Sequence, residues 1–416
     1  MNIFVLNCGS SSLKFQIMQT DLEMIEKDQD KTIAKGLIER VGSQSLINFQ
    51  VDGRSPIKLA TPLRDHRAAL LYAINWITNP ETQIPGIESL QDVHAIGHRV
   101  VHGGERFKRS IRIDAAVISE IEDCIDLAPL HNPANLKGIY AARDVFGQTI
   151  PQVAIFDTSF HSTMDEVTYL YALPYQYYRR YKIRKYGFHG TSHRYVAYKY
   201  RKLAGIKKEE CNIITLHLGN GASACAIKAG KSIDTSMGMT PIEGLMMGTR
   251  TGDLDPAVIE LLAYKEGATL DEIFAILNKR SGLLGISGLT NDMRDLIEEE
   301  QEHSDRRATL AINMFCGRVR KYIGAYTAAM NGVDALCFTA GIGENSAEIR
   351  RRICNNMNWL GVELDDELNQ QAFGGREMMI STPNSKVKIY VIPTNEELIL
   401  ARDTCRVVLN VQNPAN

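Results

Sequence analysis

Three glycine-rich turns in the sequence each follow an apolar segment and have the residue types that hold a phosphate. They are NCGSSSLK (7–14), HLGNGAS (217–223) and FTAGIGENS (338–346). Backbone N–H groups and serine hydroxyls in such turns bind phosphate oxygens, and Lys14 adds a positive charge. None has the GxxxxGK[ST] spacing of a Walker P-loop, and the first turn alone fits an ordinary hairpin equally well. Three such turns in one chain favour a nucleotide ligand.

Two arginines and two histidines have sequence contexts that suit anion binding. Arg99 ends the apolar part of AIGHRVVHGGERF, and Arg250 lies in the glycine-bearing loop MGTRTGDLDP. His189 and His193 lie among small residues in KYGFHGTSHR. Such groups hold a carboxylate or a transferring phosphoryl group. Taken singly, each also fits a structural ion pair or a hydrogen-bonded core histidine.

Acidic residues follow two further apolar segments. Asp157 ends the apolar part of VAIFDTSFH, where open α/β sheets place reactive groups. Glu396 and Glu397 follow a second such segment in PTNEEL. Carboxylates beside a nucleotide act on Mg²⁺, usually through water, although both glutamates also fit the acidic first turn of a helix. The sequence has no HExxH zinc motif and no GxSxG nucleophile elbow.

Composition excludes several classes of protein. The chain has 416 residues, with 47 Lys plus Arg against 49 Asp plus Glu, a net charge of −2, and 44% hydrophobic residues. These values are typical of a soluble globular protein of two or three domains, not of a disordered, collagen-like or coiled-coil chain. The balanced charge gives no electrostatic footprint for nucleic acid or an anionic membrane.

Signals for export are missing from the sequence. The eight cysteines are dispersed without a CxxC pair, which predicts free thiols in a reducing compartment. The N-terminus MNIFVLNCGSSS has only a short apolar run, and no stretch approaches about 18 uncharged apolar residues. We therefore expect a cytoplasmic protein without a membrane span.

Strand-like and helical patterns alternate along the chain, which predicts an α/β fold. An amphipathic helix is expected over 114–127 with Asp114 as its cap, and the longest helical pattern covers 304–330 and starts at Ser304. Residues 334–357 suggest a buried strand, a glycine-rich turn and a helix.

An internal echo suggests duplication. FVLNCGSSSLKFQI (4–17) and TLHLGNGASACAI (215–227) both consist of a strand, a small polar turn and a strand. Aligning Gly9 with Gly221 also aligns Ser11 with Ser223. The identity is too weak to prove duplication, but it fits two similar α/β domains facing one cleft.

The ordered motifs of the chain resemble those of the acetate kinases. They are NCGSSSLK, GHRVVHGG, APLHNPAN, FDTSFH, YGFHGTSH, HLGNGAS, MGTRTGDLDP, DMRDL, FTAGIGENS and TNEEL. The resemblance extends from residue 3 to about residue 404. It implies two duplicated ribonuclease-H-like domains of the actin-like ATPase kind, flanking a nucleotide cleft. The implied domains are 1–156 with 397–416, and 157–396.

The resemblance also implies an activity. Acetate kinases reversibly transfer a phosphoryl group from Mg-ATP to acetate, giving acetyl phosphate and ADP, and they work as homodimers. The implied cofactor is Mg²⁺, with Mn²⁺ as a second candidate, and no nucleic acid or membrane partner is expected. We expect direct in-line transfer, because acetate is already anionic at pH 7 and needs positioning and charge neutralisation rather than a strong base.

The resemblance assigns roles to residues of this chain. Arg99 would bind the acetate carboxylate, and the methyl pocket would comprise Val101, Leu130, Phe188 and Pro241. The catalytic residues would be Asp157, His189 and Arg250. The metal site would use Asn7 and Glu396, with Ser10 and Ser12 beside it. The nucleotide-binding residues would be Lys14, His217, Leu218, Gly219, Asn220, Gly221, Asp292, Met293, Arg294, Gly341, Ile342, Gly343, Glu344 and Asn345.

Two alternatives stay open at this point. Val101 narrows the methyl pocket and favours acetate, but a propionate or butyrate kinase would share the same scaffold. A non-metabolic ATPase of the actin or chaperone type would not need Arg99, His189 and Arg250 in their full motifs. Thr251 and the pair Thr290-Asn291 depart from the commoner family pattern without removing a group that the mechanism needs.

Overall fold

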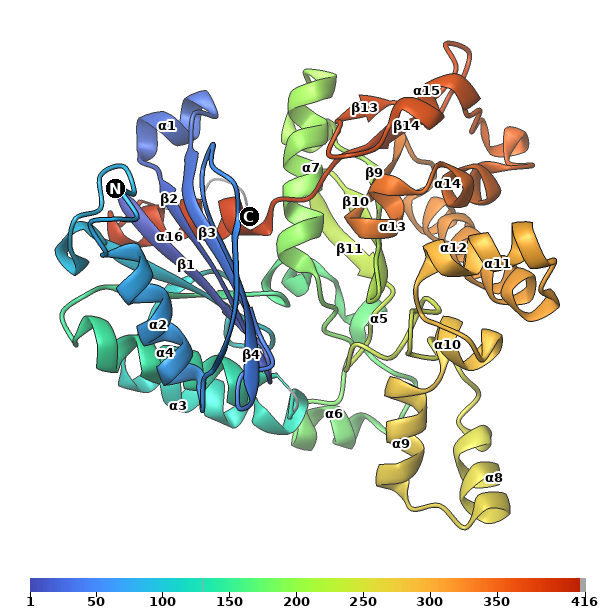
Figure 1. Cartoon of the computed structure of the whole chain (residues 1–416). Helices are drawn as coiled ribbons and strands as arrows, with labels where there is room; N and C mark the ends of the chain where they lie inside the picture. Colours follow the sequence, from blue (N-terminus) through green and yellow to red (C-terminus); the bar gives the residue numbers. More distant parts are fainter. Residues whose placement is uncertain (130, 412–416) are drawn as a thin grey trace. The chain divides into compact units, whose positions relative to one another are not determined.

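The computed structural model describes residues 1–129 and 131–411, which fall into two compact units. The first unit contains Met1–Phe160 and Asn395–Asn416, and the second contains His161–Thr394. The chain therefore returns to its first unit at the end, and in Figure 1 the first segment of this unit runs from blue to teal and the returning helix is red. Asp157 and Glu396, expected in the second domain, both belong to the first unit. The functional domain boundaries themselves remain a prediction.

The first unit is a mixed sheet with helices on both faces. Its strands are β1 (Asn2–Cys8), β2 (Ser12–Gln19), β3 (Lys31–Glu39), β4 (Gln44–Val51), β5 (Ile57–Pro62), β6 (Ala95–Val100), β7 (Ile111–Arg112) and β8 (Gln152–Phe156). Its helices are α1 (Leu22–Lys27), α2 (His66–Ile77), α3 (Ala115–Asp123), α4 (Asn132–Phe146) and α16 (Glu396–Val408). The strand order is β5-β4-β3-β2-β1-β6-β8-β7, with β1, β6 and β8 parallel to one another.

The alternation of side chains along β1 explains the two covered faces. Phe4 and Leu6 belong to the core cluster that also contains side chains of α2 and α4. Ile3 and Val5 point to the opposite face, where they belong to the same cluster as Leu400 of α16. A strand with both faces apolar is therefore buried on both sides, as the continuous apolar run predicts.

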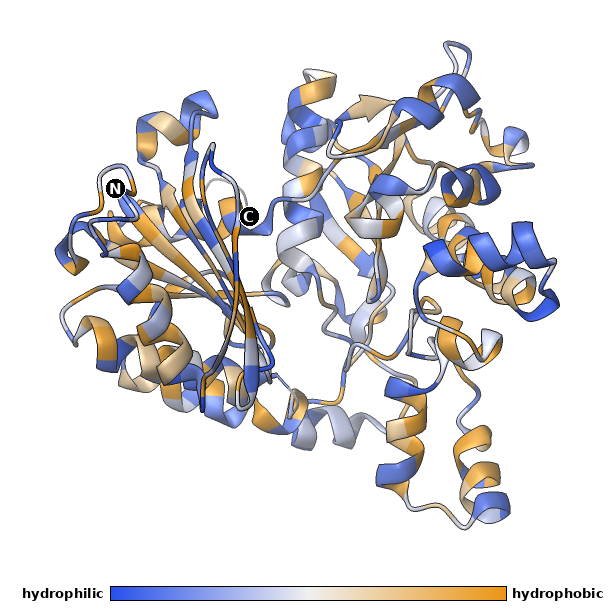
Figure 2. Cartoon of the chain, in the orientation of Figure 1, coloured by the Kyte–Doolittle hydropathy of each residue, from blue (hydrophilic) through white to orange (hydrophobic). Residues whose placement is uncertain are grey.

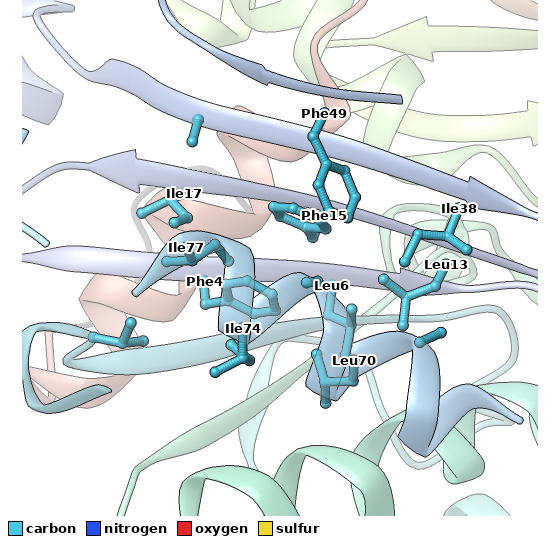
Figure 3. Packing of buried hydrophobic residues seen from close by; sticks show 14 of the residues in the cluster. Phe4, Leu6, Leu13, Phe15, Ile17, Ile38, Phe49, Leu70, Ile74 and Ile77 are labelled. Atoms are coloured by element: carbon cyan, nitrogen blue, oxygen red, sulfur yellow. The ribbon is translucent and has the colours of Figure 1, made fainter. Parts of the chain in front are cut away.

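Aromatic rings fill the core between the sheet and α2. In Figure 3, Phe15 lies between Phe4 and Phe49, with ring centroids 5.4 Å and 5.3 Å away. A Cβ atom at Gly36 of β3 would come within 2.3 Å of the Phe15 ring and 2.6 Å of the Phe49 ring. Glycine at this strand position therefore makes room for the aromatic stack.

Helix α16 is held closely against the other face of the sheet. A Cβ atom at Gly97 of β6 would lie 2.4 Å from the Thr404 hydroxyl, so β6 accepts the helix only because this residue is glycine. Arg402 of α16 donates to Asp30 from its Nε atom at 3.0 Å and also pairs with Asp28. These contacts fix the helix whose first residue is Glu396.

The second unit contains a six-stranded sheet and a larger set of helices. Its strands are β9 (Ile213–Leu218), β10 (Ala222–Lys228), β11 (Lys231–Thr235), β12 (Ala335–Thr339), β13 (Met378–Met379) and β14 (Lys388–Val391). Its helices are α5 (Glu166–Tyr169), α6 (Tyr175–Tyr181), α7 (Gly190–Ala204), α8 (Ala257–Glu266), α9 (Leu270–Lys279), α10 (Gly282–Ser287), α11 (Met293–His303), α12 (Arg306–Met330), α13 (Ala340–Asn345), α14 (Ala347–Cys354) and α15 (Asp366–Gln371). Figure 2 shows α11 as mostly hydrophilic, and its buried residues are Met293 and Leu296.

The two sheets share one topology. The second has the order β11-β10-β9-β12-β14-β13, with β9, β12 and β14 parallel. The first contains the equivalent series β3-β2-β1-β6-β8. Each series starts from an antiparallel hairpin, β1–β2 or β9–β10, at the position of the sequence echo. The expected α/β fold with a duplicated unit is confirmed.

Three local expectations need correction. Asp114 does cap α3, but the helix ends at Asp123, where a short 3₁₀ turn over Ile125–Leu127 replaces the expected continuation. Helix α12 is capped by Asp305, whose side chain accepts from the Ala308 N–H, because Ser304 adopts a left-handed conformation that ends α11. The glycine-rich turn after β12 is itself the short helix α13.

All eight cysteines are buried free thiols, as expected. Burial raises the pKa of the Cys8 thiol to about 12, so this thiol stays protonated. In the part of the chain that the structure describes, no helix is long and apolar enough to cross a membrane.

The buried histidine of β6 predicts a pH-dependent stability. His98 bonds the Gln152 side chain at 2.8 Å, and burial lowers the pKa of His98 to about 4. Because an unfolded histidine titrates near 6.5, the unfolded chain binds more protons between pH 6.5 and 4, and stability falls as the pH falls. We expect a loss of about 1–2 kcal/mol between pH 7 and 5, measured by urea unfolding.

His98→Gln keeps a donor for Gln152 and removes the titration. The part of the acid destabilisation that comes from this site should then disappear. An unchanged dependence of the urea midpoint on pH in this variant would contradict the assignment.

Candidate active-site residues in the two units

The carboxyl ends of β6 and β8 bring Arg99 and Asp157 together in the first unit. Arg99 Nε lies 3.0 Å and 3.2 Å from the two Asp157 oxygens, and Nη2 lies 2.6 Å from Oδ2. The Asp157 side chain is 1% exposed and the Arg99 side chain 22%. Burial disfavours the charged guanidinium, but the carboxylates of Asp157 and Glu396 outweigh this effect and raise the pKa of Arg99.

Two glutamates at the start of α16 extend this charge cluster. Glu396 Oε2 lies 3.8 Å from Arg99 Nε, and Glu397 forms an ion pair with Lys14 of β2. Burial raises the pKa of Glu396, and the charges of Asp157 and Glu397 add to the increase against the opposing Arg99 and Lys14. Three carboxylates thus share two cations.

The β1–β2 hairpin carries Asn7, Ser10 and Ser12 of the predicted metal site. Asn7 pairs with Lys14 across the hairpin, and the turn closes through a bond from Gly9 N–H to Ser12 O of 2.9 Å. Ser10 lies in this turn. Val101 follows β6, and its N–H donates to the Asn135 side chain at 3.0 Å. Leu130 lies outside the described residues.

In the second unit, His189, Arg250 and Gly221 converge on one point. A Cβ atom at Gly221 would lie 3.5 Å from His189 Cε1, 3.6 Å from His189 Nε2 and 3.7 Å from Arg250 Nη1. His189 immediately precedes α7 in a left-handed conformation with φ 56°, a strained backbone for a side chain of this size. Backbone conformations of this kind are often found at functional positions.

Arg250 carries a positive charge that no carboxylate in the described ranges neutralises. Its Nη1 atom donates to the Pro241 carbonyl at 3.3 Å and lies 3.9 Å from the Met247 sulfur. Burial alone lowers the pKa of Arg250, which nevertheless stays a cation because a guanidinium is protonated at any physiological pH. Phe188, next to His189, is 2% exposed. A partly buried guanidinium without a carboxylate partner suits an anion.

A cavity of about 1050 Å³ lies in the second unit and is large enough for a nucleoside. Eight predicted nucleotide-binding residues line it: Gly219, Asn220, Asp292, Met293, Arg294, Gly341, Ile342 and Asn345. The side chain of Arg294 is exposed and folds back on Asp292, with Nη2 2.6 Å from Oδ2. The hydrogen bonds from Arg294 lower the pKa of Asp292.

Five other predicted nucleotide residues of this unit do not line the cavity, and four of them are His217, Leu218, Gly343 and Glu344. Glu344 Oε1 instead accepts from the backbone N–H of Ala340 and Thr394, at 2.8 Å and 3.0 Å. Gly221 also lies apart from it, beside His189.

Sequence reasoning missed one wall of the cavity. It includes Ile297 and Gln301 of α11, and Gln370, Ala372 and Phe373 at and after α15. These residues belong to no glycine-rich or charged motif, and only the polar–apolar periodicity of α11 hints that one side of this helix faces inward.

A buried arginine joins the two walls and was also missed. Arg350 is 0% exposed and donates to the carbonyl oxygens of Gly343 and Glu344 at 2.9 Å. It also donates to the carbonyls of Asn369 and Ala372 at 2.7 Å and 2.8 Å. Burial lowers the pKa of Arg350 to about 10. Its fork of donors therefore ties α13 to the loop that follows α15.

Comparisons with known proteins agree along the whole chain. The model of the acetokinase family matches residues 2–402. An acetate kinase of Chloroherpeton thalassium is 59% identical over 414 residues, covering 98% of this chain and 99% of the relative. One from Solibacter usitatus is 56% identical over 415 residues, covering 100% of both.

Solved structures give the same result. The crystal structure of Porphyromonas gingivalis acetate kinase has a TM-score of 0.90 and 43% identity, covering 98% of this chain and 99% of that chain. A propionate kinase from Francisella tularensis has a TM-score of 0.89 and 40% identity, covering 99% and 100%. The fold is thus one that carries kinases with a carboxyl group as acceptor. The chain belongs to the acetokinase family.

The position of Gly221 beside His189 and Arg250 predicts that one added methyl group lowers the activity. Gly221→Ala requires no strained backbone, and its Cβ would make ordinary contacts of 3.5–3.7 Å. The variant should fold normally, but the methyl would fill the space beside His189 and Arg250. We expect kcat/KM for phosphoryl transfer to fall about 10²-fold or more.

Gly317→Ala in α12 is the matched control, since a Cβ there meets nothing within 4 Å. Its activity should be unchanged. Thermal melting would show that both variants are folded. Full activity in Gly221→Ala would show that the reacting group does not occupy this space.

Proposed function

We propose that the protein is an acetate kinase, which reversibly transfers the γ-phosphoryl group of Mg-ATP to acetate and gives acetyl phosphate and ADP. The observation that carries the proposal is that the His189 ring and the Arg250 guanidinium both lie within 4 Å of the position that a Cβ atom of Gly221 would occupy. This donor set suits a phosphoryl group in transfer. The curated relatives named acetate kinase support the choice of acceptor.

Arg99 would bind the carboxylate of acetate. The Asp157 carboxylate accepts from the Nε–H and one Nη2–H of Arg99, so three of the five N–H groups of Arg99 remain for a second carboxylate. Asp157 would act by fixing the guanidinium plane. This bidentate contact makes an orienting role a better assignment for Asp157 than proton transfer, because acetate is already anionic at neutral pH.

His189 and Arg250 would stabilise the phosphoryl group during direct in-line transfer. An anionic acceptor must approach a polyanionic phosphate tail, so fixed positive charge and donors lower the barrier. The cavity residues around Gly219, Asp292 and Gly341 would hold the nucleoside and leave the phosphates near the glycine turn. In the first unit, Lys14, Ser10 and Ser12 of the first hairpin are the predicted phosphate-binding residues.

A magnesium ion would be held in the first unit, where the described residues contain no ready-made group of three or more His, Cys, Asp or Glu ligands. Asp157, Glu396 and Glu397 carry one negative charge more than Arg99 and Lys14 neutralise, and their mutual repulsion helps raise the pKa of Glu396. Glu396 and Asn7 supply the oxygen ligands that Mg²⁺ prefers, partly through water, and Mn²⁺ is a second candidate. When bound, the ion would neutralise phosphate charge.

Several finer assignments belong to this proposal. Val101, Leu130, Phe188 and Pro241 would form the pocket for the acetate methyl group. The protein would work in the cytoplasm as a homodimer, with no nucleic acid or membrane partner. A propionate kinase is the second candidate function, because the similar structure from Francisella tularensis has that name.

Hydroxamate trapping of acyl phosphate tests the reaction and the carboxylate site together. Wild-type protein with Mg-ATP should give most product from acetate, less from propionate and least from butyrate. Arg99→Ala should lose about 10²–10³-fold in kcat/KM for acetate. Arg106→Ala is the control and should keep full activity, because among the described residues Arg106 pairs only with Glu120 at the surface.

ATP hydrolysis without any acyl phosphate would contradict the proposal and assign the protein to the actin or chaperone type of ATPase. A preference for propionate would keep the chemistry and change the acceptor.

Val101→Ala tests the methyl pocket. One methylene in an apolar pocket contributes about 1–3 kcal/mol, so the larger pocket should shift the ratio of kcat/KM toward propionate about tenfold. The ratio is measured with both acids under one set of conditions. An unchanged ratio would remove Val101 from the pocket.

A further inference from the structure

A buried serine in the second unit bridges two histidine rings. Ser223 Oγ lies 2.9 Å from His189 Nδ1 and 2.7 Å from His193 Nε2. The other nitrogen of His193, Nδ1, lies 2.7 Å from the Thr215 hydroxyl. Thr215, His193 and Ser223 are all 0% exposed. They form a chain of hydrogen bonds that ends at the imidazole beside Gly221.

The backbone fixes both ends of this chain. His193 lies in the first turn of α7, four residues after His189, and its N–H donates to the His189 carbonyl at 3.0 Å. Ser223 lies opposite His217 in the register of β9 and β10. The His189 ring stacks on His217 with centroids 4.1 Å apart. Stacking sets the plane of the ring, and Ser223 sets its rotation within that plane.

Proton counting restricts the chain to two arrangements. A hydroxyl has one hydrogen, and the described contacts offer Ser223 no other acceptor, so Ser223 donates to one ring nitrogen and accepts from the other. Burial lowers the pKa of His193 well below its usual value, so one nitrogen of this ring carries the proton. Either Ser223 donates to His193 and accepts from His189 Nδ1–H, or His193 donates to Ser223, which donates to His189 Nδ1.

An anion bound beside Gly221 would favour the second arrangement. The Arg250 guanidinium and the Nε2 atom of His189 both approach the position beside Gly221. A neighbouring positive charge disfavours a second cation at the histidine, and a neutral ring can donate to an anion only if Nε2 carries its proton. In the second arrangement Nδ1 accepts from Ser223, and the proton is on Nε2.

We propose that Ser223 is a positioning residue of the phosphoryl transfer, whose hydroxyl transmits the Thr215–His193 arrangement to His189 and keeps a neutral His189 with Nε2–H directed at the transferring group. The inference rests on the proposed function for its catalytic consequence. The Ser223 bridge between the two rings is a contact within the second unit.

Ring-¹⁵N histidine NMR of the full chain measures the tautomer directly, with His189→Gln used to assign the signal. Wild-type protein should show His189 protonated on Nε2 and unprotonated on Nδ1. In Ser223→Ala the signal should shift toward a mixture of tautomers. A wild-type His189 protonated on Nδ1 would overturn the proposal, whether or not the protein makes acyl phosphate.

Kinetics supply the second test. Ser223→Ala should lower kcat about 10²-fold while the KM values for ATP and acetate change little, because the serine orients a group that acts in the transition state. Ser223→Thr restores the hydroxyl and should recover part of the loss. An unchanged kcat in Ser223→Ala would overturn the catalytic role.

Ser236→Ala is the control for packing and stability. Ser236 is equally buried, and its Oγ accepts from the Ala224 N–H at 2.9 Å. This variant loses one buried hydrogen bond that involves no histidine, so its kcat and its histidine spectrum should be unchanged. If wild-type protein makes no acyl phosphate, the proposed function fails, and the NMR result still decides the tautomer.

Discussion

The parallel pairing of β1 with β6, and of β9 with β12, determines where chemistry can occur in each unit. Parallel strands end at the same edge of a sheet, and the first hairpin turn opens at that edge too. In the first unit this edge gathers the turn after Cys8, Arg99 and Asp157. In the second it gathers the turn after Leu218 and the start of α13. One topological rule, used twice, therefore places every glycine-rich turn.

The two units use this edge with different electrostatics. In the first, carboxylates outnumber the arginine and lysine that neutralise them, which suits a metal cation and a single well-oriented guanidinium. In the second, Arg250 has only a carbonyl and a sulfur atom near its Nη1 atom among the described contacts, which suits an anion. Two units with similar folds thus suit ligands of opposite charge, a cation in the first unit and an anion in the second.

Local patterns predicted much of this arrangement and missed what depends on tertiary contacts. The period-2 apolar segments and glycine turns identified both hairpins, and the charged motifs identified Arg99, Asp157 and Arg250. The motifs could not reveal the role of Arg350. Its described partners are carbonyl and amide oxygens, and such uncharged partners leave no recognisable pattern in the sequence. The sequence pattern around Ser223 predicts only a turn, because its two histidine partners lie 30 and 34 residues away in the chain.

The return of the chain to its first unit has a consequence for biosynthesis. Helix α16 covers the face of the sheet that carries Ile3 and Val5, yet it is made last, after the whole second unit. During translation the first unit therefore keeps an apolar face of its sheet exposed until α16 has been synthesised, and exposed apolar surface favours aggregation. Vectorial synthesis thus makes the second unit the first part of the chain that is able to fold to completion.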